Sequence, residues 1–174
     1  MDTTTSENSL KNWILLVVLT LIWGSSFILI KRGLEVFSPG EVGAYRMVAA
    51  ASLLLPLSLP RIKQLSKTQV KNLLITGMLG SFIPAFLFPI AQTQLSSSLT
   101  GVLNALTPLF TIIVGILFFN LKSNKQKVIG ILLGLVGLVL SVTAGKTLHF
   151  DNFSYSFFVV LATIFYGLNV NMVG

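Results

Sequence analysis

The sequence contains no cysteine and only one histidine, His149. Disulfide bonds and thiolate metal sites are therefore excluded, and no histidine cluster is available to hold a metal ion. Charge is also scarce, with 12 basic and 5 acidic residues among 174. A soluble domain carries roughly a quarter charged residues. A water-soluble fold of this length could not cover its surface with so few charges, so most of the surface must face lipid.

Long uncharged runs fill most of the chain, and lysines and arginines lie in short clusters between them. A helix needs about 20 mostly apolar residues to cross the hydrocarbon of a bilayer. The runs therefore predict an all-α, polytopic membrane bundle whose surroundings are a lipid bilayer. The six expected transmembrane helices lie near residues 12–30, 42–60, 72–91, 99–119, 128–145 and 153–174.

The positions of the basic residues predict how the helices are oriented. Most lysines and arginines fall in the N-terminal tail and in the loops after the second and fourth spans. Because positive residues stay in the cytoplasm, we expect the N-terminus inside a bacterial inner (plasma) membrane. Clusters of this kind form no basic face on a folded domain, so the net charge of +7 predicts no binding of nucleic acid.

The fourth span carries hydroxyl and amide side chains at alternating steps of three and four residues, which places them on one face of a helix. Two interpretations are open: hydrogen bonds between helices, or a pathway for a solute. The length of the stripe favours the pathway, as does Pro108, which frees the main-chain carbonyl of Asn104. The residues of this polar stripe are Ser97, Thr100, Asn104, Thr107 and Thr111.

Further candidates for the pathway lie in three other spans. Arg46 is the only charge inside a predicted span, and it either snorkels to the interface or holds an anionic group. Tyr45 beside it supplies a hydroxyl. Trp23 and Ser25 lie in the first span. The alternative for Trp23 is a place in the belt of aromatic residues at the membrane–water interface. Tyr166 and Asn169 share a face of the sixth span.

Small residues at helical spacing mark one face of the fifth span, and small faces let helix backbones approach closely in lipid. We interpret this face as helix packing without further function. Its residues are Gly130, Gly134, Gly137 and Ser141.

Other absences bear on chemistry. No predicted span has a carboxylate at its centre, and the chain has no glycine-rich phosphate loop. We therefore predict no enzyme activity, no cofactor and no metal.

Several short motifs of the sequence resemble those of a known family. Residues 23–27 (Trp-Gly-Ser-Ser-Phe), Ser38-Pro39 and Tyr45-Arg46 look like the start of an EamA-type domain of the drug/metabolite transporter superfamily. The segments Thr107–Phe110 and Gly130–Gly137 are similar to its fourth and fifth helices. The resemblance implies ten helices in two inverted five-helix repeats, with a central cavity and alternating access.

The resemblance also suggests a division of the chain. Residues 1–11 would be a disordered cytoplasmic tail, 12–145 a five-helix repeat, and 146–174 a loop and the first helix of an incomplete second repeat. The missing second repeat, or a second chain, would be a partner. Family members usually carry a glutamate after the fourth helix, where this sequence has Asn120-Leu121-Lys122.

The sequence thus predicts half of a transporter for small organic metabolites, an exporter or an exchanger. The alternative is a membrane interaction subunit that transports nothing and whose polar helix face docks a partner helix. A metabolite screen that finds no transported solute would favour the alternative.

Overall fold

The structure, a computed structural model, describes residues 3–122, 124–143 and 153–173. Within these ranges one helix follows another and there is no strand. The helices are α1 (Thr3–Gly33), α2 (Pro39–Ile62), α3 (Lys67–Gly77), the π-helical segment η1 (Met78–Phe82), α4 (Ile83–Gln92), α5 (Ser97–Asn104), α6 (Thr107–Phe119), α7 (Lys125–Thr143) and α8 (Phe153–Val173).

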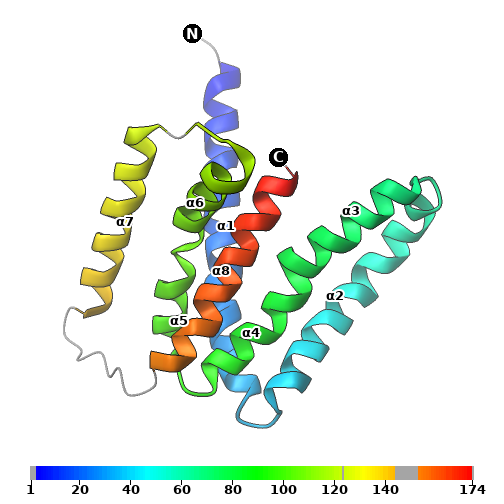
Figure 1. Ribbon diagram of the computed structural model, residues 1–174, viewed down its shortest axis with the longest axis horizontal. Helices are drawn as coiled ribbons and strands as arrows, with labels where there is room; N and C mark the ends of the chain where they lie inside the picture. The colour runs from blue at the N-terminus through cyan, green and yellow to red at the C-terminus, as the bar shows by residue number, and fades with distance from the viewer. Residues whose placement is uncertain (1–2, 123, 144–152, 174) are drawn as a thin grey trace.

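The last helix of the chain lies in the middle of the bundle (Figure 1). Helix α8 packs against α4, α5 and α6, while α2 packs against α4. Helix α7 lies at one edge of the view, and the α2–α3 pair leans away at the other edge. Helix α1 begins and α8 ends at the same end of the bundle.

Five of the six predicted spans coincide with helices that are long and apolar enough to cross a membrane. Two of these spans are composite. One consists of α3, η1 and α4, which follow one another directly, and the other consists of α5 and α6, which a short turn joins. The fifth predicted span, 128–145, forms α7 up to Thr143, and its crossing of the membrane stays a prediction. The predicted all-α membrane bundle is confirmed.

The N-terminal tail differs from the expectation. Residues 1–11 were expected to be disordered, but α1 begins at Thr3. No proline or glycine lies between Thr3 and Trp23, so nothing in the sequence stops the apolar helix from continuing toward the N-terminus. The predicted loop that begins at residue 146 and contains His149 lies outside the described residues as far as residue 152.

Two of the helices begin with the same capping arrangement. The Ser38 hydroxyl accepts a hydrogen bond from the Glu41 N–H at 3.3 Å, and the Glu41 carboxylate accepts one from the Ser38 N–H at 2.8 Å. Ser66 and Gln69 repeat this capping box at the start of α3. Each box satisfies N–H groups that the first turn of a helix leaves without partners.

The buried core surrounds α8 near the end of the bundle where that helix begins. Val159 and Ala162 of α8 are fully buried, beside Phe88 and Ala91 of α4 and Ile30 of α1. Large apolar side chains such as Trp13 remain exposed over the outside of the helices. This distribution, apolar on both the inside and the outside, is that of a bundle surrounded by hydrocarbon.

The third span contains a π-helical segment that the sequence did not predict. Segment η1 ends where the N–H of Ile83 bonds to the carbonyl of Met78, five residues earlier. Pro84 follows directly, and it cannot donate the α-helical bond that the carbonyl of Gly80 would otherwise receive. The wider turn fits the proline into the span.

Helices α6 and α8 approach each other most closely at Gly167. A Cβ atom added to Gly167 would lie 3.0 Å from the main-chain carbon and oxygen of Phe110 and from the nitrogen of Thr111. Because these are backbone atoms, they cannot turn aside as a side chain would. Only glycine fits at this crossing without moving a helix.

We therefore expect Gly167→Ala to destabilise the protein by about 1–3 kcal/mol, the usual cost of overpacking. The measurement is the thermal unfolding midpoint of the purified protein in detergent. Gly24→Ala in α1 is the matched control, since an added Cβ there meets no atom within 4 Å. Equal midpoints for the two variants would contradict the close crossing.

Candidate functional site

The hydroxyl groups of the polar stripe bond mostly to the main chain of their own helices. Thr100 donates to the Ser96 carbonyl at 2.9 Å, and Thr111 donates to the Thr107 carbonyl at 2.8 Å. Ser97 is different, because it donates to the Phe27 carbonyl of α1 at 3.1 Å. The first interpretation, hydrogen bonds between helices, therefore describes Ser97, whereas the hydroxyls of Thr100, Thr107 and Thr111 bond within their own span.

The stripe runs through a break in the fourth span. Helix α5 ends at Asn104 and α6 begins at Thr107, with Pro108 in its first turn. Proline frees the Asn104 carbonyl as predicted, and the Thr107 hydroxyl donates to that carbonyl at 2.7 Å. The side-chain amide oxygen of Asn104 is buried without a hydrogen-bond partner. Asn104 is therefore the residue of the stripe that still has an unused polar atom.

Arg46 does not simply snorkel to water. Its residue is half-buried, and one guanidinium nitrogen, Nη1, is buried without a hydrogen-bond partner in the part of the chain that the structure describes. The guanidinium lies close enough to the phenol of Tyr166 in α8 to interact with it electrostatically. Tyr166 in turn stacks on Phe88, with 6.1 Å between the ring centroids. The structure thus brings together two candidates from the second and sixth spans.

Asn169 lies one turn after Tyr166 and contacts the π-helical segment. Its side chain touches Gly80 so closely that a Cβ on this glycine would overlap it. The amide oxygen of Asn169 is buried without a partner. Gly80 is a candidate that the sequence did not single out, since only the neighbouring helix shows that the Asn169 side chain lies against it.

A second asparagine of α8 was also missed. The Asn171 amide donates to the Thr111 carbonyl at 2.8 Å and to the Gly167 carbonyl at 2.7 Å. It therefore joins α8 to the stripe helix α6 and leaves no unused donor beyond these two bonds. Its proximity to Asn169 in the sequence was the available signal.

Three predicted residues lie apart from this group. Trp23 is 65% exposed, and the Ser25 hydroxyl donates to the Ile22 carbonyl of its own helix at 3.1 Å. Tyr45 is exposed, and its ring packs against Phe37 with 5.0 Å between centroids. Within the described chain, these three side chains do not join Arg46 and Tyr166, and their place in a pathway stays a prediction.

The glycine face of α7 has open space beside it. A Cβ atom added to Gly130, Gly134 or Gly137 would meet no other atom within 4 Å. The side chain of Ser141 lies outside the described part of the chain. Because the described residues leave this face uncovered, its role in helix packing stays a prediction that requires a partner beyond them.

Four described residues have buried side-chain atoms without a partner: Arg46, Gln92, Asn104 and Asn169. We call Arg46, Asn104 and Asn169 the central polar set, and Gln92 lies near the end of the bundle. Arg46 lies seven residues into its span from Pro39, and Asn104 lies seven into its span from Ser97. At 1.5 Å per residue, both are about 10 Å from the same end of the bundle. Asn169 is 16 residues into α8 and therefore lies deeper, about 24 Å from that end at the same rise per residue. Each residue can form a hydrogen bond to a polar molecule, Arg46 as a cationic donor and the two asparagines as acceptors.

The fold and these residues define a multi-pass helical membrane protein with buried polar groups. The model of the EamA-like transporter family matches residues 11–143. The chain therefore belongs to the EamA-like transporter family, a family of transporters rather than of enzymes.

Curated relatives share this stretch. The chain is 31% identical over 133 residues to the uncharacterized inner membrane transporter YedA of Escherichia coli, covering 75% of this chain and 43% of YedA. It is 29% identical over 138 residues to the uncharacterized transporter YyaM of Bacillus subtilis, covering 77% and 45%. An uncharacterized transporter of Archaeoglobus fulgidus is 24% identical over 131 residues, covering 75% and 47%.

The chain thus spans under half the length of these curated relatives. No solved structure matches it.

The bond from Thr107 to the freed carbonyl leads to a stability prediction. Thr107→Val keeps the shape but leaves the Asn104 carbonyl without that donor, so we expect a loss of about 1–3 kcal/mol. Thr111→Val is the matched control, because the Thr107 carbonyl lies within α6 and keeps its helical N–H partner. Chemical unfolding in detergent measures both, and Thr107→Ser should retain stability. Equal losses for the two valine variants would contradict the assignment.

Proposed function

We propose that this chain forms the first half of a transporter that moves small organic metabolites across the membrane by alternating access. The observation that carries the proposal is the central polar set, whose buried atoms have no partner among the described residues. The family supports a role in transport, and the residues of the set would contact the solute. No cofactor is implied.

The unused atoms support the proposal because of their cost. A buried polar atom without a hydrogen bond costs about 1–3 kcal/mol, and more when the group is charged. Hydrocarbon cannot satisfy such an atom, so inside a bundle it must meet protein, water or solute. A polar solute that passes between the helices would satisfy Arg46, Asn104 and Asn169 in turn.

The irregular helices support movement at the same place. The α5–α6 break follows Asn104 directly, and η1 lies against Asn169. Interrupted helices near the middle of the membrane are where transporters bind solutes, and π-helical segments are often found at functional sites. We propose that these two irregular segments change shape when the bundle switches between its inward-open and outward-open states.

A second set of helices would complete the cavity. The open glycine face of α7 and the length of the relatives support a second repeat or a second chain beside this one. Trp23, Ser25 and Tyr45, which are exposed in this chain, would then line the cavity from the first half.

The role of Arg46 is tested by transport. We expect Arg46→Gln to lower kcat/KM for the transported solute by at least about tenfold, since a hydrogen bond to a charged group is worth about 1.5–3 kcal/mol. The measurement is uptake of a labelled metabolite library into liposomes that contain the full-length protein. Arg61→Gln, at the far end of the same helix and exposed, is the control and should transport normally. Normal transport by Arg46→Gln would remove the arginine from the pathway.

One observation favours the alternative of an interaction subunit that transports nothing. The hydroxyls of the polar stripe are satisfied within the chain, so the stripe by itself does not require a solute. Full-length protein that moves no member of the metabolite library, yet associates stably with a partner membrane protein, would support this alternative over transport.

We also propose that the N-terminus is cytoplasmic, which places the α1–α2 connection on the outer side. Because the chain has no cysteine, single thiols can report each side. We expect Val36→Cys, at a residue that is 79% exposed, to react with a membrane-impermeant maleimide in intact cells. Gln64→Cys, between α2 and α3, should react only after the membrane is opened. The reverse pattern would invert the orientation.

A further inference from the structure

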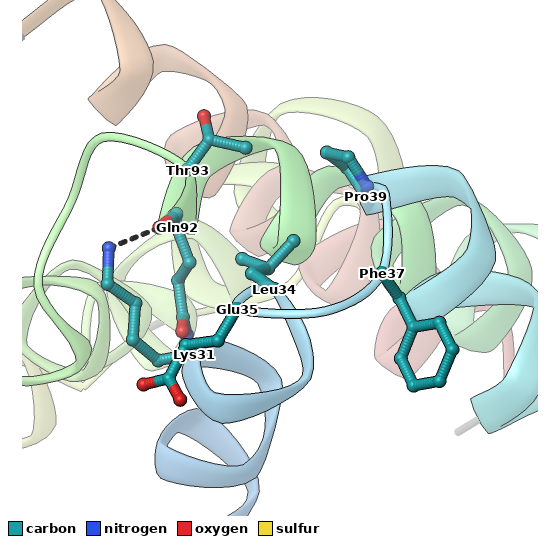
Figure 2. A pocket seen from close by; sticks show the side chains of 7 residues that line it. All are labelled: Lys31, Leu34, Glu35, Phe37, Pro39, Gln92 and Thr93. Atoms are coloured by element: carbon teal, nitrogen blue, oxygen red, sulfur yellow. Dashed lines mark hydrogen bonds between the residues drawn. The ribbon is translucent and has the colours of Figure 1, made fainter.

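A cleft lies at the end of the bundle that carries the α1–α2 connection, away from the central polar set. Its volume is about 230 Å³, the space of about eight water molecules at roughly 30 Å³ each. Figure 2 shows the side chains around it, which come from the end of α1, the loop after it, the start of α2 and the end of α4. The lining residues are Lys31, Leu34, Glu35, Phe37, Pro39, Gln92 and Thr93.

Lys31 brings a positive charge to this cleft without a carboxylate partner. Its ammonium donates to the main-chain carbonyl of Gln92 at 2.7 Å (Figure 2). It also donates to the main-chain carbonyl of Leu95 at 3.2 Å. These bonds satisfy carbonyls at the end of α4, but they do not neutralise the charge. An ammonium has three N–H groups, so one remains.

Glu35 lines the same cleft but pairs with a different cation. Both of its carboxylate oxygens accept hydrogen bonds from Arg32, at 3.1 and 3.4 Å. In the described part of the chain Lys31 forms no ion pair. Lys31 is therefore the cation in the lining of the cleft that has no ion-pair partner among the described residues.

Gln92 supplies the second observation. The residue is 0% exposed, and neither the nitrogen nor the oxygen of its side-chain amide has a hydrogen-bond partner among the described residues. Only its main-chain carbonyl is used by Lys31, while its side chain extends separately along the cleft (Figure 2). A buried amide with both atoms unused is costly, and a partner that offers both an acceptor and a donor would satisfy it.

We propose that this cleft is a binding subsite for the carboxylate of a small hydroxy acid or a similar solute at the outer mouth of the transport pathway. The carboxylate would accept hydrogen bonds from the Lys31 ammonium and from the Gln92 amide nitrogen. The neighbouring hydroxyl of the solute would donate to the Gln92 amide oxygen. This placement on the pathway rests on the proposed transport function, whereas binding itself does not.

Protection of a thiol tests the subsite. Thr93→Cys, in a background without other cysteines, places a reactive group in the lining of the cleft. The probe is glycolate, which carries one carboxylate and one hydroxyl, and the measurement is the rate of maleimide labelling of the full-length protein in nanodiscs. We expect glycolate to slow labelling in a saturable manner, and its neutral isostere glycolamide to have no effect.

Substitutions identify the groups that bind. Gln92→Leu should raise the glycolate concentration for half-protection by about tenfold, the factor expected for one hydrogen bond to a charged group. Gln92→Glu, which keeps the size of the side chain and adds a negative charge, should abolish protection, while Lys31→Arg should keep it. Gln64→Leu, exposed at the end of α2, is the matched control and should leave protection unchanged.

Several outcomes would overturn the proposal. Equal protection by glycolamide would show that charge is not recognised, and equal protection by inorganic phosphate would contradict a site for a carboxylate next to a hydroxyl. Protection that survives Gln92→Glu would place the ligand elsewhere. Protection without solute transport in liposomes would refute the transport function alone, whereas transport without protection would refute the subsite alone.

Discussion

Hydrocarbon offers no hydrogen bonds, and this constraint governs every polar group of the chain. Long helices satisfy the main chain, and capping boxes at Ser38 and Ser66 satisfy the helix starts. Where Pro108 interrupts the pattern, the hydroxyl of Thr107 takes the place of the missing N–H. The few buried polar atoms without a hydrogen-bond partner therefore mark places where neither lipid nor a neighbouring helix satisfies the group.

Helix α8 determines where those atoms lie. It packs closely on α6 through Gly167 and on η1 through Gly80, and its polar side chains reach into the bundle between these contacts. The phenol of Tyr166 lies within electrostatic range of the Arg46 guanidinium, Asn171 joins α8 to α6, and Asn169 keeps an unused oxygen. One helix thus combines close packing with inward-facing polar side chains, because small residues at the contacts, Gly167 on α8 and Gly80 on η1, allow the approach.

The two polar regions differ in their chemistry. The central polar set lies within the spans and combines a single cation with amide oxygens. The cleft at the bundle end combines an ammonium with a whole amide, and an ion pair beside it removes the nearest carboxylate from competition. Each region carries a cation beside amide groups with unused atoms, so in the transport function that we propose a solute with a negative charge would find a hydrogen-bonding cation in both.

The sequence by itself determined the class of fold, because hydropathy and charge spacing specify which segments can lie in lipid. It also revealed the polar stripe and Arg46, since helical periodicity is local. Only the tertiary structure decided which polar atoms are satisfied: three stripe hydroxyls bond within their own span and Ser97 bonds to α1, whereas Gln92 and Asn169 keep unused atoms. Gly80, Asn171 and the π-helical segment were missed for the same reason. A side chain's partner depends on which helix packs beside it, and that is set by contacts between segments far apart in the sequence.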